Sequence, residues 1–251
     1  MAAEVILAQA LRDTKLTAAF RKGLDHDQVA ELSEAICRQA KQRLRDEAEF
    51  FAVLYLNKSE GSRSLDCHDE ISRVAGVDLA AHARRFFGRL KNYLREAITA
   101  AAMGLAGNRP LTGEELGDID RHSAVQEAYL GRFMEEFIGA PPALRPEKST
   151  EIIAIAPPMT VAQFIARAES YGNSPWAAGY EIHRSQVARE GIMTRERRVL
   201  GAVDERNCSE CPELASLGFQ PLGVLPPLGS TTCNGNCRCH WEHSSASTST
   251  A

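Results

Sequence analysis

The residues best suited to chemistry in this sequence are cysteines near its C-terminal end. Five of the seven cysteines lie between positions 208 and 239. Cys208 and Cys211 form a C-x-x-C pair, and Cys237 and Cys239 form a C-x-C pair. Two thiolate pairs joined by a loop of roughly 25 residues are typical of a tetrahedral Zn²⁺ site. We therefore expect a structural zinc ion whose ligands are these four cysteines.

Other possible donors lie near the two pairs, so the identity of one of the four ligands is undecided. Cys233, four residues before Cys237, is the main alternative ligand. His240 and His243 are expected to be solvated or to lie just outside the ligand set. A disulfide or free thiols are the alternatives to a metal. Metal is favoured because the N-terminal segment carries Glu4 and no basic run, so that no secretory signal and no oxidising compartment are expected.

The loop between the two cysteine pairs is poorly suited to fold alone. It is short and contains several glycines and four prolines, Pro212, Pro221, Pro226 and Pro227. A segment of this size seldom buries enough apolar surface to be stable, so a metal is the expected cross-link. Short strands are predicted at residues 197–203, 219–222 and 224–225, around the turns of this segment.

Familiar catalytic patterns do not fit these cysteines. In zinc deaminases H-x-E precedes P-C-x-x-C, whereas here His240-Trp241-Glu242 follows the pair and Asn207 replaces the proline. A thiol redox centre normally opens a helix within a βαβ unit, and Pro212 and the absence of βαβ patterning argue against one. Neither a phosphate-binding G-x-x-x-x-G-K-[ST] loop nor a G-x-S-x-G elbow occurs. We expect a closed structural site, no enzymatic activity and no small-molecule substrate.

The elements before the cysteines are predicted to be helices. Apolar residues recur at helical spacing over residues 29–55 and 79–97. A capping box at residues 112–115 begins a further helix that should end at Gly139. Shorter helices are predicted to begin at Thr160 and, with Ser174 as N-cap, at Pro175, the latter ending at Gly191.

The predicted fold class is mainly α, with a multi-helix body and a small C-terminal α+β module rich in cysteine. A proline-rich stretch after Gly139 indicates a linker, and the last residues are low in complexity. The predicted organisation is a helical body (1–139), a linker and helices leading into the module (140–191), the β/zinc module (192–243) and a disordered tail (244–251).

Composition and charge restrict the function. The formal net charge of −4 gives no support for a nucleic-acid-binding surface. The basic residues Arg84, Arg85 and Arg89 are expected to form a solvated helix face, because Glu96 and other acids accompany them. The longest apolar runs are far shorter than a membrane span, so we expect no membrane partner.

A longer pattern extends across the C-terminal segment. A helix ending at Gly191 is followed by a basic strand and then by D-E-R-x-C-x-x-C, P-P-L and N-C-R-C. This succession resembles the Mu F-like minor head proteins of tailed bacteriophages, over roughly the C-terminal half of the chain. Such sequences tend to carry a histidine before the last cysteine pair, where the nearest candidate here is Cys233. The matching residues are Asp204, Glu205, Arg206, Cys208, Cys211, Leu214, Gly218, Pro226, Pro227, Leu228, Asn236, Cys237, Arg238 and Cys239.

The resemblance implies a structural virion protein. It would be a minor capsid or head-morphogenesis component, assembled in the host cytoplasm and associated with the portal. The implied partners are the portal and capsid proteins of the same virion, and contact with packaged DNA is not indicated by the charge. The alternative is a zinc-ribbon nucleic-acid-binding protein. Acidic residues in the same segment offset the basic residues Arg195, Arg197 and Arg198, which makes this alternative less favoured.

Overall fold

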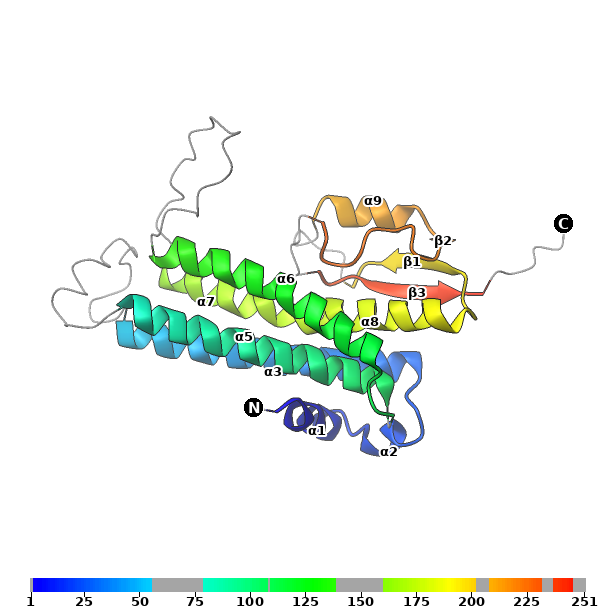
Figure 1. The fold of residues 1–251 in the computed structure, drawn as a ribbon, viewed down its shortest axis with the longest axis horizontal. Coiled ribbons are helices and arrows are strands. Elements are labelled where there is room, and N and C mark those ends of the chain that lie inside the picture. The colour runs from blue at the N-terminus through cyan, green and yellow to red at the C-terminus, as the bar shows by residue number, and fades with distance from the viewer. Residues whose placement is uncertain are drawn as a thin grey trace.

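Long helices and one small sheet make up the described part of the chain. The computed structural model describes residues 2–55, 79–107, 109–138, 160–201, 208–231 and 237–245. The fold class predicted from the sequence is confirmed, since most of these residues are helical and a small strand region follows (Figure 1). The helices are α1 (Ala3–Asp13), α2 (Thr17–Phe20), α3 (His26–Tyr55), α5 (Leu79–Ala106), α6 (Gly113–Ile138), α7 (Val161–Ser170), the 3₁₀ helix η2 (Tyr171–Asn173), α8 (Ser174–Glu190) and α9 (Glu210–Ser216). The strands are β1 (Arg195–Val199), β2 (Gln220–Pro221) and β3 (His240–Ser244).

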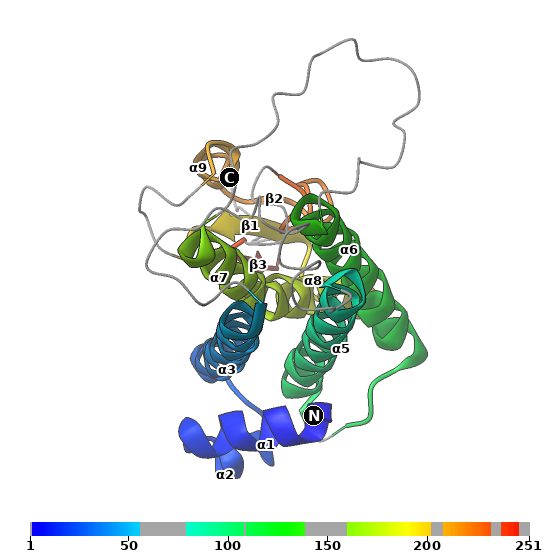
Figure 2. The same ribbon diagram turned by 90° about the vertical axis from the view of Figure 1, so that its left-hand side faces the viewer.

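The helical body is a bundle in which α3, α5 and α6 lie beside the continuous run α7–η2–α8. Helix α1 packs across the α3–α5 pair on the side away from α7 and α8 (Figures 1 and 2). The helical spacing seen in the sequence corresponds to the buried faces, because an apolar residue every three or four positions keeps one side of a helix against its neighbours. On α3 these buried residues include Leu32, Ile36, Ala40, Leu44 and Ala48.

Aromatic side chains from four helices close one end of this core. The Phe51 and Phe86 rings stack at 4.6 Å, and the Phe133 and Phe164 rings lie 5.3 Å apart. Gly172 in η2 lets the chain approach α3 closely, because a Cβ there would lie 2.6 Å from the backbone nitrogen of Lys41. Helices α7 and α8, which the sequence assigned to a connecting segment, therefore pack directly into the helical body.

The helix ends follow the local signals in most places. The predicted capping box at Thr112 is formed, with its hydroxyl accepting from the Glu115 N–H at 3.2 Å. Thr160, predicted as a helix start, forms a second capping box, in which its hydroxyl accepts from the Gln163 N–H at 3.2 Å. Helix α8 ends at Gly191, whose φ of 66° is left-handed. The prediction of Ser174 as an N-cap is wrong: Ser174 is the first residue of α8, because η2 runs directly into the helix and leaves no separate start to cap.

Helix α8 has a neighbour on most of its sides. Ala178 and Ile182 pack in one apolar cluster with Ile98 of α5. Ala177 and Tyr180 pack in a second cluster, which also holds the module cysteines and the tryptophan of β3. The same helix is therefore part of the bundle and part of the C-terminal module.

The sheet has the strand order β2-β1-β3, and both pairings are antiparallel. Strand β1 begins at Arg195, two residues before the strand predicted there, and residues 202–203 of that prediction lie outside the described residues. Of the strands predicted at 219–222 and 224–225, only β2 is formed, because the chain turns at Gly223, where φ is 87°. Strand β3 was not predicted, and it extends to Ser244, one residue beyond the predicted module boundary.

Several sequence predictions fall outside the described residues. They include the proline-rich linker, the alternative ligand Cys233 and the last six residues of the predicted tail, 246–251. Among the helices that the structure describes, none is both long enough and apolar enough to cross a membrane.

Candidate metal centre

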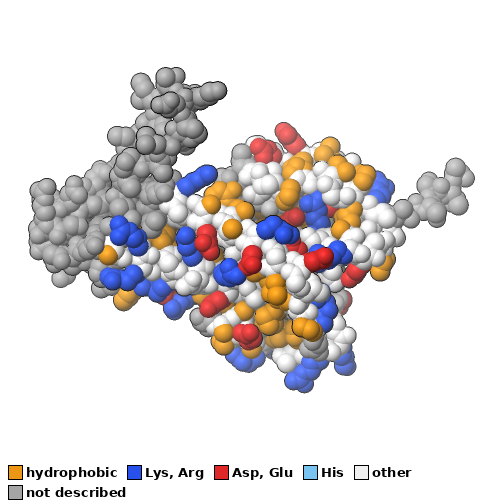
Figure 3. All heavy atoms as spheres, viewed as in Figure 1, with side chains coloured by type: hydrophobic (Ala, Val, Ile, Leu, Met, Phe, Trp, Pro, Cys, Tyr) orange, Lys and Arg blue, Asp and Glu red, His pale blue; other side chains and the backbone are white. Residues whose placement is uncertain are grey.

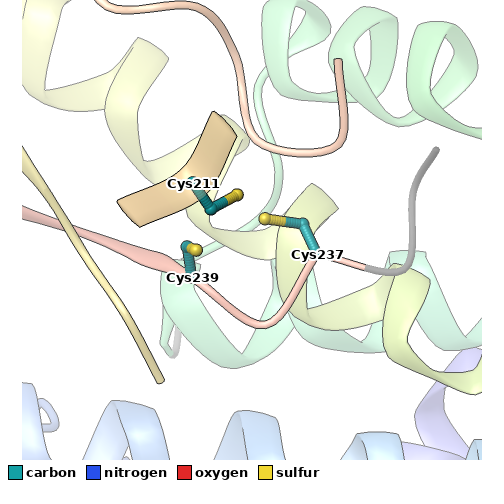
Figure 4. A group of neighbouring side chains, drawn as sticks. All are labelled: Cys211, Cys237 and Cys239. Carbon is teal, nitrogen blue, oxygen red and sulfur yellow. The ribbon is translucent and has the colours of Figure 1, made fainter. Parts of the chain in front are cut away.

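Three buried cysteine side chains converge between helix α9 and the segment that enters strand β3. The Sγ atoms of Cys211, Cys237 and Cys239 all lie within 4.8 Å of one another. Figure 4 shows their sulfur atoms directed toward a shared space. Each of these residues is at most 2% exposed. They are close enough to hold one metal ion.

The fourth cysteine of the predicted set adjoins this group. Cys208 is half-buried, and its Sγ lies 3.1 Å from the Sγ of Cys211. The hydroxyl of Thr231 lies 3.5 Å from the Cys208 Sγ. The chain thus brings the C-x-x-C and C-x-C pairs together from positions that are distant in sequence.

The two histidines considered near the cysteines lie against other rings. The ring of His240 is 5.5 Å from that of Tyr180, and the ring of His243 is 5.5 Å from that of His183. Within the described part of the chain, the cluster of possible metal ligands contains cysteines alone. That the histidines lie outside the ligand set stays a prediction.

Local backbone geometry sets the direction of each thiol. Cys208 and Cys211 lie one turn apart at the start of α9, where the Cys211 N–H donates to the Cys208 carbonyl at 3.2 Å. Cys237 and Cys239 are both buried while Arg238 between them is half-buried, as side chains alternate along an extended segment. Gly201 allows this segment to pass, because a Cβ at position 201 would lie 2.2 Å from the Arg238 carbonyl oxygen.

The protein environment opposes a negative charge on the buried sulfur unless a cation is present. Desolvation raises the pKa of the Cys211 thiol to about 12, and the hydrogen bond with Cys208 adds to the rise. Arg198 supplies one nearby positive charge, with its Nη1 donating to the Cys211 Sγ at 3.6 Å. A metal ion bound to several thiolates would provide the larger compensating charge and would deprotonate them.

A buried ionic network holds the metal centre against α8. Glu196 of β1 is fully buried and accepts from Arg184 Nε at 2.6 Å. It also accepts from the Gly223 N–H at 3.1 Å. Glu181 accepts from the Leu228 N–H at 2.6 Å and from the Trp241 indole at 2.7 Å. Glu181 therefore joins helix α8 to strand β3 and to the turn at Leu228. Glu196 joins strand β1 to helix α8 and to the turn at Gly223.

The same network secures the P-P-L turn. Arg198 donates to the carbonyls of Pro226 and Pro227, and Arg184 donates to the Leu225 carbonyl at 2.7 Å. The two guanidinium carbons lie 4.4 and 5.2 Å from the centre of the Trp241 ring. Residues 225–228 are thus fixed by side chains of α8 and β1 as well as by backbone turns.

The sequence interpretation did not place Glu181, Arg184, Glu196 and Arg198 in a buried network. A strand reading R-E-R-R-V suggests solvent-facing charges, yet Glu196 and Arg198 both point inward and are at most 1% exposed. The available signal was that Glu196 and Arg198 are two positions apart, and so lie on one face of the strand, and that helix α8 carries complementary charges at Arg184 and Glu181. That signal does not indicate burial, which depends on how the sheet and α8 pack.

No protein-family model, no curated protein and no solved structure matches this chain. Function is therefore inferred from the chain's own residues and from the resemblance in its C-terminal segment.

Proposed function

We propose that this protein is a non-catalytic component of a tailed-bacteriophage head, with a C-terminal module held together by a structural zinc ion. The supporting observation is that residues carrying the sequence resemblance meet in space. The C-x-x-C and C-x-C pairs adjoin, and the P-P-L turn is bonded to the buried ionic network beside them. These contacts are consistent with the sequence resemblance marking one folded module.

The donor set favours zinc, with Cys208, Cys211, Cys237 and Cys239 as ligands. Zn–S bonds of about 2.3 Å place tetrahedral sulfurs about 3.8 Å apart. The observed limit of 4.8 Å among three of the sulfurs needs only small side-chain shifts to reach that spacing. Soft thiolates select zinc over hard cations, and a complete set of four leaves no open position for catalysis. The ion would therefore serve to stabilise the module.

The surface supports an assembly role more than a nucleic-acid role. Figure 3 shows basic and acidic side chains interspersed over the visible face. On α5, Arg89 pairs with Glu47 at 3.1 Å, and Lys91 lies 3.7 Å from Glu127. In the module Arg198 is buried, and Arg197 pairs with Glu242. These basic residues are engaged within the protein, which disfavours the zinc-ribbon alternative because phosphate contacts need accessible cations.

The ligand set is tested by elemental analysis of protein purified under reducing conditions. We expect one zinc per chain in the wild type and loss of zinc in the Cys211→Ser variant, which removes a buried ligand. Cys37→Ser is the matched control, because Cys37 is also buried but lies on helix α3 of the helical body. Equal zinc content in both variants would contradict the proposed ligands.

The assembly role is tested by co-expression with candidate portal and capsid proteins of the same phage. We expect co-purification with the portal protein at physiological salt. A chain that binds neither protein and instead retains duplex DNA with an affinity that falls steeply with salt would support the nucleic-acid alternative.

A further inference from the structure

We infer that Cys208 and Cys211 form a peroxide-sensitive pair, whose oxidation to a disulfide releases the metal ion. The inference rests on the proposed zinc site and adds a means of regulating it. It assigns different roles to the four ligands, which the cysteine spacing alone treats as equivalent.

Exposure distinguishes one residue from the other three. Cys211, Cys237 and Cys239 are buried, whereas Cys208 is only half-buried. Among these four ligands, Cys208 is therefore the one that a small oxidant from solvent reaches most directly. Oxidation of cysteine depends on exposure as well as on thiolate character, and a bound metal keeps the sulfur in its thiolate form.

Geometry then supplies the second sulfur. The Cys208 and Cys211 sulfurs lie 3.1 Å apart and belong to a single turn of backbone at the start of α9. A disulfide needs a sulfur–sulfur distance of about 2.05 Å, so the pair closes with a movement of about 1 Å from this spacing, or of about 2 Å from the spacing expected around a bound zinc ion. Cys211 is thus placed to capture an oxidised Cys208 before further oxidation.

Neighbouring groups favour this order of events. Arg198 donates a hydrogen bond to the Cys211 sulfur, which withdraws electron density from that thiolate and makes it the weaker initial nucleophile. The hydroxyl of Thr231 lies beside both sulfurs, at 3.5 Å from that of Cys208 and 3.8 Å from that of Cys211, so it does not distinguish them. Cys208 is therefore the attacking thiolate and Cys211 the resolving one.

The reaction with hydrogen peroxide balances in two steps. The Cys208 thiolate attacks one peroxide oxygen, the O–O bond breaks, and a sulfenic acid and hydroxide form. The Cys211 thiolate then attacks the Cys208 sulfur and expels a second hydroxide, giving the disulfide. The two sulfurs lose two electrons, and two protons from solvent convert the hydroxides to water. The metal ion loses two of its four ligands and leaves, while Cys237 and Cys239 take up protons.

The test uses the full-length, zinc-loaded chain freed of reductant. One equivalent of hydrogen peroxide is added, zinc release is followed with a chromogenic chelator, and remaining thiols are blocked with an alkylating agent. A Glu-specific protease then cuts after Glu205, Glu210 and Glu213, which separates Cys208 from Cys211. We expect release of one zinc per chain and recovery of the two peptides joined by a disulfide, with both effects reversed by dithiothreitol and added zinc.

Variants sharpen the assignment. Zinc-loaded Cys208→Ser should release its metal at least about tenfold more slowly under peroxide, because the accessible thiolate is gone. Cys37→Ser should behave as the wild type. If Cys208→Ser fails to bind zinc, the peptide map of the wild type still shows whether peroxide joins Cys208 to Cys211.

Two negative results have different meanings. Zinc that stays bound under peroxide, or a disulfide that joins other cysteines, would overturn this inference and leave the zinc site intact. An untreated chain without stoichiometric zinc would overturn the proposed site itself, and this inference with it.

Discussion

The helical body and the C-terminal module of this chain are stabilised by different interactions. The core of the body consists of apolar side chains on facing helices, such as Leu44 on α3 and Phe86 on α5, both fully buried. The core of the module is small and contains cysteines together with buried carboxylates and guanidinium groups. A long amphipathic helix can bury an entire face, whereas a segment of short strands and turns cannot.

This difference has an energetic consequence. Apolar burial tolerates variation, since losing one contact leaves the rest of a large core in place. A buried ionic network is less tolerant, because removing one partner leaves the other charge desolvated. Removing a single ligand or charge should therefore be enough to unfold the small module, whereas the larger core of the body should stay folded after the truncation of one side chain.

Metal removal should have the largest effect. Structural zinc contributes on the order of 10 kcal/mol to the folding of small modules, so chelation should unfold residues 208–244 while α1, α3 and α5 stay folded. Hydrogen exchange with and without chelator measures this directly. We expect loss of protection in α9 and β3, partial loss along the module side of α8, and full recovery on adding zinc. Unchanged exchange in α9 would show that the metal does not stabilise the module.

Breaking the buried ionic network should have the next largest effect. Glu196→Ala leaves the Arg184 guanidinium without its closest carboxylate, at an expected cost of about 3–5 kcal/mol. Glu242→Ala is the matched control, because it removes a partly exposed pair with Arg197 in the same sheet and should cost no more than about 1 kcal/mol. Urea unfolding of the zinc-loaded variants provides the comparison. Similar costs for the two variants would show that burial of the network is not important.

A cavity in the core of the helical body tests how much apolar packing contributes to its stability. Leu44→Ala removes a fully buried side chain and should lower the free energy of unfolding by about 2–5 kcal/mol. The zinc content should not change, because Leu44 lies in the core of the body. Val5→Ala, at a position that is 50% exposed, should change stability by less than about 0.5 kcal/mol. Loss of zinc from Leu44→Ala would mean that the two cores are not separable.

The smallest effect concerns pH and the start of α6. The hydrogen bond from Arg109 lowers the pKa of Glu115 from 4.5 to about 2. This contribution stabilises the folded state above pH 4.5 and is lost as the pH falls toward 2. Because Arg109 is partly exposed, Arg109→Ala should cost at most about 1 kcal/mol at neutral pH.

Urea unfolding across this pH range measures the Arg109 effect. The difference between the variant and the wild type should shrink as the solution is acidified from pH 4.5 toward pH 2. A difference that does not depend on pH would indicate a packing role for Arg109 instead of an ionic one.

Sequence reasoning was most successful where structure is determined locally. Helical spacing, the capping box at Thr112, the helix start at Thr160 and the terminating Gly191 each depend on residues within a few positions, and each is found as expected. The approach of the two cysteine pairs was also predicted, because two pairs of metal-ligand residues that bind one ion must come together in the fold.

Features determined by distant packing were missed. Strand β3 has the sequence H-W-E-H-S, which lacks an alternating apolar pattern, and it forms by pairing with β1. Helix α9 has only seven residues, with Pro212 in its first turn, where a proline is tolerated. The burial of Glu196 requires a guanidinium from α8, and no local rule identifies that partner.

The sharing of α8 between two cores has a mechanical consequence. Domains joined by a flexible linker can reorient, but here one uninterrupted helix contributes side chains to both parts. Rotation of one part relative to the other would require breaking that helix or separating one of its faces from its packing partners. A binding partner would therefore contact two surfaces whose relative orientation is fixed.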